Sequence, residues 1–384
     1  MFKISKKSAQ ARTGVLTTAH GKLNTPFFMP VATRGALKLV STEDVKKLGA
    51  QIILSNTYHL FLRPGEKHVK KLGGLHKFID WPGAILTDSG GYQVFSLAKG
   101  RNKNGENLVK LSEQGVEFKS YLNGSRHKLT PESVIDIQHQ LGVDISVCLD
   151  ECVALPASVE YIRESIELTT RWAARAKAHH NKIKGAKSLL FAVVQGGLDR
   201  QLRLKSLGDL AALDFDGYNI GGLSVGESPA EMYKVLDYLM PAMPTNKPRY
   251  LMGVGYPENI VAAVHRGVDM FDCVIPTREG RHGRLFSWVA GSDAKLAKAL
   301  ASGKGQDNFY TIHNLANQKF VSDKTAINSN SKLPELRNYS RAYLHYLFKI
   351  DEALAQRLTT LNNLEFYLDL MAKLRQIIKT NSAN

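Results

Sequence analysis

Three aspartates and a glutamine stand at the ends of short apolar runs in this 384-residue chain. They are Asp88, Asp150, Asp272 and Gln195. A pair of carboxylates suits the cleavage of a glycosidic bond, because one can attack the anomeric carbon while the other moves protons. A single aspartate after a strand is more simply explained as a helix cap. Three of them, with a Gln-Gly-Gly turn, favour a polar pocket with carboxylate chemistry.

Two other uses of these residues stay open. Three aspartates could bind a metal ion, but no histidine stands nearby with ligand spacing, and His59 could supply at most one ligand. The glycine pairs Gly196-Gly197 and Gly221-Gly222, like Gly253-Val254-Gly255, could cradle phosphate. Tight turns require glycine equally.

A basic segment follows the last of these aspartates. Residues 276–286 carry three arginines, Arg278, Arg281 and Arg284, among glycines that let a backbone approach closely. We expect a loop that contacts phosphates and base edges of a nucleic acid. The alternative is a solvated basic loop without a ligand.

Eight apolar runs must position these residues. Between most of them lie helical patterns with start signals, such as Ser41-Thr42, Thr130-Pro131, Ser228-Pro229 and Pro257. Strands alternating with helices over about 260 residues predict a (β/α)8 TIM barrel, in which catalytic residues gather at the carboxyl ends of the strands. The runs are Phe27–Thr33, Gln51–Asn56, Ala84–Asp88, Ile145–Asp150, Leu189–Gln195, Tyr218–Gly222, Arg249–Gly255 and Met270–Ile275.

Two regions depart from this alternation. Residues 96–129 contain two short apolar stretches and an Asn123-Gly124 turn, which predict an inserted β-hairpin. From about residue 279 helical patterns dominate, with Tyr339–Ile350 and Leu364–Ile378 as predicted helices. We therefore expect a catalytic barrel over 1–278 and a C-terminal, mostly helical subdomain over 279–384 that begins with the basic loop.

Composition bounds the partners and the compartment. Fifty-one basic against 35 acidic residues give a net charge of +16, which favours a nucleic acid over an anionic membrane surface as partner. No apolar stretch is long enough for a membrane span, and no secretory signal is evident. Three cysteines without a C-x-x-C pair indicate a reducing, cytoplasmic location.

Several strings of the sequence resemble the bacterial tRNA-guanine transglycosylases. The similarity runs through nearly the whole chain, in order. The strings are TDSGGYQV at 87–94, DEC at 150–152, VQGG at 194–197, GGLSVGE at 221–227, FDCVIPTR at 271–278 and RNYSRAYLH at 337–345.

The resemblance implies exchange of the wobble guanine in tRNAs with a G-U-N anticodon for a free deazaguanine base. It implies that Asp272 is the nucleophile on the ribose, that Asp88 is the general acid/base, and that the enzyme is a homodimer. Thr277, Arg278, Arg281 and Arg284 would bind tRNA. The implied base-binding set consists of Asn56, Ser89, Tyr92, Asp150, Gln195, Gly222, Leu223 and Met252.

The chemistry of guanine agrees with these roles. A guanine in an anticodon loop must be splayed out before its glycosidic bond is accessible. Asp150 can accept hydrogen bonds from N1–H and the exocyclic amine of guanine, and adenine offers neither in that arrangement. An unpaired buried acceptor costs about 1–3 kcal/mol, so several such contacts exclude other bases.

Residues near the base pocket bear on the choice of incoming base. Val225 and Cys152 are similar to the bacterial pattern, which implies 7-aminomethyl-7-deazaguanine (prequeuine) rather than the bulkier queuine. Glu227 could hold the Leu223–Ser224 peptide so that the pocket presents either a carbonyl or an amide. Its alternative role is that of a glutamate preceding the helix that starts at Ser228-Pro229.

The chain departs from the family at a structural zinc site. The bacterial pattern has C-x-C-x-x-C before the RNYSR string and a histidine one helix later. Here these four positions hold Ser331, Leu333, Leu336 and Asn362, so we predict that no zinc is bound and that leucine packing fills the site.

Three alternative functions remain at the level of sequence. One is a deazaguanine transferase that acts on DNA or another RNA, since phosphate contacts carry no sequence information. Another is a catalytically silent tRNA-binding paralogue, against which the intact Asp88 and Asp272 argue. A barrel hydrolase of sugars would share the carboxylates but would not explain the charge.

Overall fold

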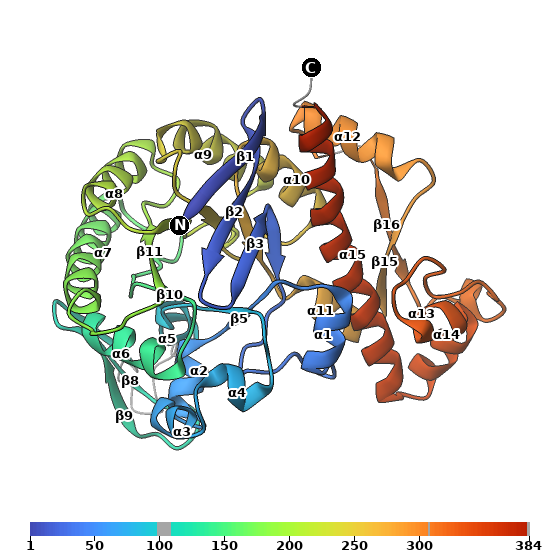
Figure 1. Ribbon diagram of the computed structural model, residues 1–384, viewed down its shortest axis with the longest axis horizontal. Helices are drawn as coiled ribbons and strands as arrows, with labels where there is room; N and C mark the ends of the chain where they lie inside the picture. The colour runs from blue at the N-terminus through green and yellow to red at the C-terminus, as the bar shows by residue number, and fades with distance from the viewer. Residues whose placement is uncertain (98–108, 306–307, 382–384) are drawn as a thin grey trace.

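A closed barrel of eight parallel strands forms the centre of the molecule (Figure 1). The computed structural model describes residues 1–97, 109–305 and 308–381. A parallel bridge between Val31 and Leu54 joins the two ends of the sheet, so the predicted (β/α)8 class is confirmed. In spatial order the strands are β4 (Phe27–Met29), β14 (Met270–Asp272), β13 (Arg249–Leu251), β12 (Gly217–Ile220), β11 (Leu189–Val194), β10 (Ile145–Val147), β6 (Ala84–Thr87) and β5 (Ile52–Ser55).

Each apolar run of the sequence supplies one strand, and both faces of the strands are buried. Along β5, Ile52 and Leu54 point into the barrel interior, whereas Ile53 packs with the outer helices. In β11, Phe191 and Val193 lie inside the barrel. Burial on both faces explains why the runs are nearly continuous in apolar residues. Most strands end before their runs do, so the last residues of each run face the mouth of the barrel.

Helices surround the barrel, and their start signals are observed where the sequence places them. Ser41, Thr130 and Ser228 each form a capping box, and Pro257 opens its helix. The helices are α1 (Thr42–Leu48), α2 (Thr57–Leu62), α3 (Glu66–Lys71), α4 (Leu75–Ile79), α5 (Gly91–Leu97), α6 (Pro131–Leu141), α7 (Val159–His180), α8 (Arg200–Ala212), α9 (Pro229–Ala242), α10 (Pro257–His265) and α11 (Ile275–Arg281).

An N-terminal antiparallel sheet, which the sequence reading missed, covers the other end of the barrel. It consists of β1 (Phe2–Ser8), β2 (Ala11–Thr18) and β3 (Gly21–Thr25). Leu16 and Leu23 pack with the side chains of the barrel interior. Arg12 forms a buried ion pair with Asp269, the residue before β14. This sheet closes the end opposite the strand termini that carry the aspartates.

The inserted segment is a three-stranded sheet rather than the predicted hairpin. Its strands are β7 (Val109–Ser112), β8 (Gly115–Lys119) and β9 (Arg126–Leu129). Residues 98–108 of the predicted insertion lie outside the described part of the chain. The third strand was missed because its sequence, RHKL, has one apolar residue and no alternation.

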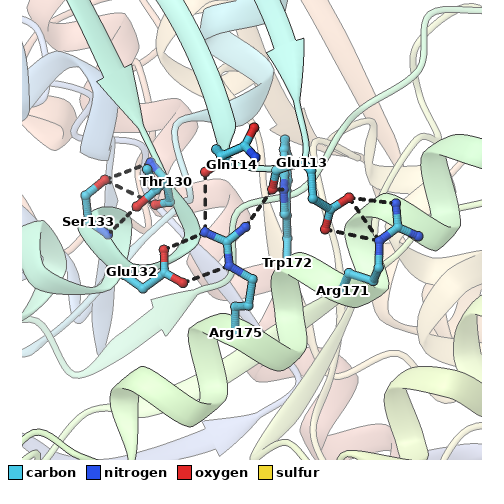
Figure 2. Close-up of polar contacts among 8 residues, drawn as sticks. All are labelled: Glu113, Gln114, Thr130, Glu132, Ser133, Arg171, Trp172 and Arg175. Atoms are coloured by element: carbon cyan, nitrogen blue, oxygen red, sulfur yellow. Dashed lines mark hydrogen bonds and ion pairs between the residues drawn. The ribbon is translucent and has the colours of Figure 1, made fainter.

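Arginines of α7 hold this sheet against the barrel (Figure 2). Arg175 donates to the carboxylate of Glu132 at 2.8 Å and to the carbonyl oxygens of Glu113 and Gln114 in the β7–β8 turn. Arg171 pairs with the Glu113 carboxylate at 2.9 Å. The β7–β8 turn is therefore attached to α7, and Arg175 joins α7 to α6 through Glu132.

The C-terminal region contains a second missed element, a two-stranded antiparallel sheet. It is formed by β15 (Arg284–Trp288) and β16 (Tyr310–Asn314). The basic segment expected as a loop is mostly the short helix α11 and the start of β15, because Ile275 and Pro276 are buried and begin a helical turn. The remaining elements are α12 (Ser292–Ser302), a 3-10 turn (Gln318–Phe320), α13 (Pro334–Asn338), α14 (Arg341–Lys349) and α15 (Ala353–Asn381).

The long helix α15 ties the C-terminal region to the barrel. It packs against α11, β15, β4 and the N-terminal sheet (Figure 1). The predicted helix 364–378 lies within it, and the predicted helix 339–350 is observed as α14. Among the described helices none has the length and apolar character that crossing a bilayer requires.

Candidate active site

One cavity of about 550 Å³ opens at the carboxyl ends of the barrel strands. All residues expected to act on a base line it, although they come from seven strand ends spread over more than 200 positions of sequence. They are Asn56, Asp88, Ser89, Tyr92, Asp150, Gln195, Gly222, Leu223, Met252 and Asp272.

Asp88 lies at the end of β6 in a nearly closed environment. Its carboxylate accepts hydrogen bonds from the Asn56 side-chain amide and, at 3.1 Å, from the Thr57 backbone N–H. Burial raises the pKa of Asp88 to about 7; the Thr57 bond opposes this rise and the neighbouring Asp272 carboxylate adds to it. A carboxyl group with a pKa near neutrality can both donate and accept a proton at physiological pH.

Asp272 lies at the end of β14 and faces the same cavity. Its Oδ1 accepts hydrogen bonds from the Tyr250 hydroxyl at 2.6 Å and from the Gly253 backbone N–H at 2.8 Å. Burial raises its pKa, and these two bonds oppose the rise because they stabilise the ionised form. Among the described residues no hydrogen bond reaches Oδ2, so this oxygen is available to the cavity.

Tyr250 is a functional residue that the sequence reading missed. It occupies the middle of β13, is fully buried and packs in the barrel interior. In the sequence it reads as one more apolar strand residue. Its hydroxyl was the only signal, because a buried phenol requires a hydrogen-bond partner.

Asp150 is the centre of a polar group on the opposite wall. Its two carboxylate oxygens accept from the Ser89 hydroxyl at 2.9 Å and from Gln195 Nε2 at 2.8 Å. Burial raises the pKa of Asp150, and the bonds from Gln195 and Ser89 oppose this. Fixed from both sides, the carboxylate presents its remaining lone pairs to the cavity.

Gly222 must be glycine where it stands. Its φ is +62°, and a Cβ there would lie 2.5 Å from Oε1 of Gln195. A side chain would therefore be strained and would displace the glutamine. The close approach lets the β12 terminus contribute backbone groups to the cavity wall instead of side chains.

Glu227 holds the loop after Gly222. Its carboxylate accepts from the backbone N–H of Ser224 and, at 3.1 Å, from that of Val225. Since the N–H and C=O of a trans peptide point in opposite directions, the Leu223 carbonyl is directed away from Glu227. This contact supports the role of Glu227 in holding the Leu223–Ser224 peptide.

The basic segment is only partly presented to the cavity. Arg278 is exposed and lines the cavity, and Arg284 is exposed at the start of β15. Arg281 is partly buried and donates to the Thr277 carbonyl at 2.9 Å. Thr277 is buried, with its hydroxyl on the Val274 carbonyl, so its side chain belongs to the first turn of α11 rather than to an exposed loop.

The four positions of the family's zinc ligands do not fit a zinc ion. Leu333 and Leu336 are buried in an apolar cluster. The Ser331 hydroxyl donates to Glu365, and the Asn362 amide donates to the Phe286 carbonyl at 2.9 Å. These positions offer no thiolate and no imidazole, so the donor set lacks the ligands that structural zinc takes.

A closed barrel with two carboxylates facing one cavity is typical of enzymes that cleave or transfer glycosidic bonds. The sequence profile of the family described as queuine tRNA-ribosyltransferase matches residues 7–384. A queuine tRNA-ribosyltransferase of Rickettsia typhi is 46% identical over 378 residues, which cover 98% of this chain and 96% of the relative. One from Desulforamulus reducens is 47% identical over 380 residues, covering 98% and 94%. The chain belongs to the queuine tRNA-ribosyltransferase family.

Proposed function

We propose that the chain is a tRNA-guanine transglycosylase that exchanges the wobble guanine of G-U-N anticodon tRNAs for prequeuine, the 7-aminomethyl-7-deazaguanine base. The observation that carries this proposal is the shared cavity: Asp88 and Asp272 line the same space as the Asp150–Gln195 pair. Family membership supports the same activity. A tRNA substrate and three free cysteines agree with a cytoplasmic location.

Two displacements at one carbon account for the exchange. Oδ2 of Asp272 attacks C1′ of the ribose, the C1′–N9 bond breaks, and its electron pair leaves with guanine, which takes a proton from Asp88. The arriving base loses its N9 proton to Asp88, attacks C1′, and the bond to Asp272 breaks. The two inversions leave the configuration of the sugar unchanged.

The cavity wall matches the Watson–Crick edge of guanine. Asp150 accepts from N1–H and the exocyclic amine, while Gln195 and the Gly222 backbone N–H donate to O6. Tyr92, which is half exposed, and Met252 both line the cavity, and we expect them to cover the two faces of the ring. Adenine would leave Asp150 and the O6 donors unpaired, which gives strong discrimination.

The Glu227 contact favours prequeuine as the incoming base. With Ser224 N–H held by Glu227, the Leu223 carbonyl is free to accept from the aminomethyl group of the base. Val225 and Cys152 also line the cavity. Queuine carries a larger substituent on its aminomethyl group, and we expect these two side chains to leave less room for it.

A second copy of the chain is the partner that we propose for α14. Tyr339, Tyr343, Tyr346 and Ile350 are each at least 37% exposed, and they lie on or beside this one helix. Exposed apolar side chains gathered on one face mark an interaction surface. Sedimentation equilibrium measures whether the chain is a homodimer.

The test of the activity is incorporation of labelled guanine into unmodified tRNA with a G-U-N anticodon. We expect incorporation by the wild type and none by Asp272→Asn, while the exposed control Asp209→Asn stays active. Equal incorporation by Asp272→Asn would remove this residue from its role. Incorporation into DNA but not tRNA would favour a different nucleic-acid substrate, and none by the wild type would favour a silent paralogue.

A further inference from the structure

Arg203, in the first turn of α8, is a fully buried cation beside the cavity. Its guanidinium donates only to backbone carbonyls. Nε reaches Gly197 O at 2.7 Å and Nη1 reaches Val194 O at 3.2 Å. Nη2 reaches Gly221 O at 2.9 Å and Gly222 O at 3.4 Å. No ion pair with a carboxylate is present within the described residues.

A buried arginine is an unfavourable choice if its only role is to fill space in the core. Burial of a charge without a counterion costs free energy, and apolar side chains of similar size commonly stabilise a core equally well. What an aliphatic side chain cannot do is hold two separate segments by their carbonyls. Arg203 connects the end of β11, which carries Gln195, to the end of β12, which carries Gly222.

The bond to Gly221 fixes the direction of the donor that the base meets. In a trans peptide the C=O of Gly221 and the N–H of Gly222 point to opposite sides. Because Arg203 holds the carbonyl toward α8, the Gly222 N–H is turned away from α8. Gly221 and Gly222 line the cavity, so this direction is toward the bound base.

Glycines make this close packing sterically possible. A Cβ on Gly196 would lie 2.7 Å from the Arg203 backbone nitrogen, so α8 could not approach the β11 terminus with another residue there. A Cβ on Gly221 would lie 2.6 Å from Gln195 Nε2. Gly196 is therefore needed for the close approach of α8, and Gly221 for the close approach of Gln195, which explains these two glycines without a phosphate.

We propose that Arg203 is a positioning residue for base specificity: by holding the Gly221 carbonyl it aims the Gly222 N–H at O6 of the purine. This rests on the proposed function, in which that amide reads guanine. The planar fork of arginine is required, since lysine is a single point donor and cannot reach both strand ends together.

The experiment compares binding of guanine and 6-thioguanine to the free protein by calorimetry. The thio base keeps N1–H and the amine but replaces O6 by sulfur, a weaker acceptor. For Arg203→Lys and Arg203→Gln we expect the dissociation constant of guanine to rise about tenfold, as loss of one well-aligned hydrogen bond predicts. That of 6-thioguanine should change much less, so the preference between the two bases should collapse.

Arg249→Lys is the matched control. Arg249 is another buried arginine that donates to a backbone carbonyl, that of Met243, but it lies at the opposite end of its strand. We expect it to lower the melting temperature and to keep the preference for guanine. Equal weakening of both bases by folded Arg203→Lys would show a merely structural role and overturn the inference.

The readout separates this inference from the proposed function. If the wild type binds guanine and prefers it to 6-thioguanine but transfers no base to tRNA, the proposed function is contradicted. The role of Arg203 in base preference can still be measured in that case. A wild type that binds no guanine would overturn both. Exchange kinetics add a second check, because lost positioning should raise KM for the base more than it lowers kcat.

Discussion

At the scale of single residues, two aspartates of the same type are given different environments. Asp88 is enclosed by Asn56 and Thr57, and burial raises its pKa to about 7. Asp272 has a phenol and a backbone amide on one oxygen and a free second oxygen. Separate environments for two carboxyl groups are what assign one to proton transfer and the other to attack.

The raised pKa of Asp88 predicts how activity depends on pH. Departing guanine needs the protonated form, so kcat/KM for tRNA should fall about tenfold per pH unit above pH 7. Initial rates of guanine exchange across about pH 5 to 9 measure this. A flat profile through that range would remove Asp88 from the role of general acid.

Stability supplies an independent check on the same residue. Between its ordinary value and about 7, folded Asp88 holds a proton that the unfolded chain has released. The folded state is therefore favoured less as pH rises through this window. Relative to wild type, Asp88→Asn should gain free energy of unfolding from pH 5 to 8 while losing exchange activity; a constant difference would contradict the shift.

Tyr250→Phe tests the support of Asp272. The variant keeps the buried ring and removes one of the two donors, so the pKa of Asp272 should rise further and less of it should be ionised. We expect kcat to fall about tenfold and the low-pH limb of the rate profile to move to higher pH. Tyr238→Phe, whose hydroxyl has no hydrogen-bond partner within the described residues, serves as control and should leave both unchanged.

At the scale of elements, the eight barrel strands are regular, and the inserted and C-terminal elements are the parts that depart from the strand–helix alternation. The inserted sheet is fixed by arginines of α7, and the two-stranded sheet of β15 and β16 is covered by α15. At the positions where zinc ligands were expected from the resemblance, α13 is held by apolar packing of Leu333 and Leu336 and by the Glu365 carboxylate, which accepts from Ser331 and Lys332. We propose that this packing and the buried carboxylate stabilise the region without a metal ion.

This packing predicts independence from metal. We expect less than one zinc per chain in the purified protein and no change of Tm on adding a chelator. Leu336→Ala should cost about 2–4 kcal/mol of unfolding free energy, because the side chain is fully buried. The exposed Leu72→Ala should change it by less than about 0.5 kcal/mol. Stoichiometric zinc, or a fall in Tm with chelator, would show another ligand set.

At the scale of the whole molecule, charge and shape act together. A net charge of +16 attracts a polyanion to the whole surface, and the barrel presents one mouth with its catalytic groups. The closed opposite end, under β1–β3, leaves the carboxyl ends of the strands as the route to Asp88 and Asp272. Electrostatic attraction by the positive surface, together with one barrel mouth that holds the catalytic groups, suits a large anionic substrate of which only one nucleotide reacts.

Salt should separate these two contributions. Raising the salt concentration from about 50 to 200 mM should increase KM for tRNA by tenfold or more, because phosphate contacts release counterions. The dissociation constant of free guanine, which is neutral, should stay nearly constant. Salt dependence of similar size for both ligands would show that the charge does not act through the phosphates of tRNA.

The order of the barrel strands along the chain, the main helix starts and the residues at the strand ends could be predicted from the residues alone. These follow from local rules: apolar runs form buried strands, and Ser or Thr before Glu, Asp or Pro begins a helix. Elements with weak local patterns were missed, such as the polar strand β9 and the two-stranded sheet β15–β16. The helical turn at Ile275 was missed because its arginines and glycines indicate a loop that contacts a nucleic acid.

How the side chains work together depends on contacts that form only in the folded chain. The closeness of Gln195 and Asp150, the bond from Tyr250 to Asp272 and the reach of Arg203 to Gly221 join positions far apart in the chain. Desolvation and hydrogen-bond direction depend on what surrounds a group in space. For that reason the near-neutral pKa of Asp88 and the aim of a backbone amide could not be read from residue order.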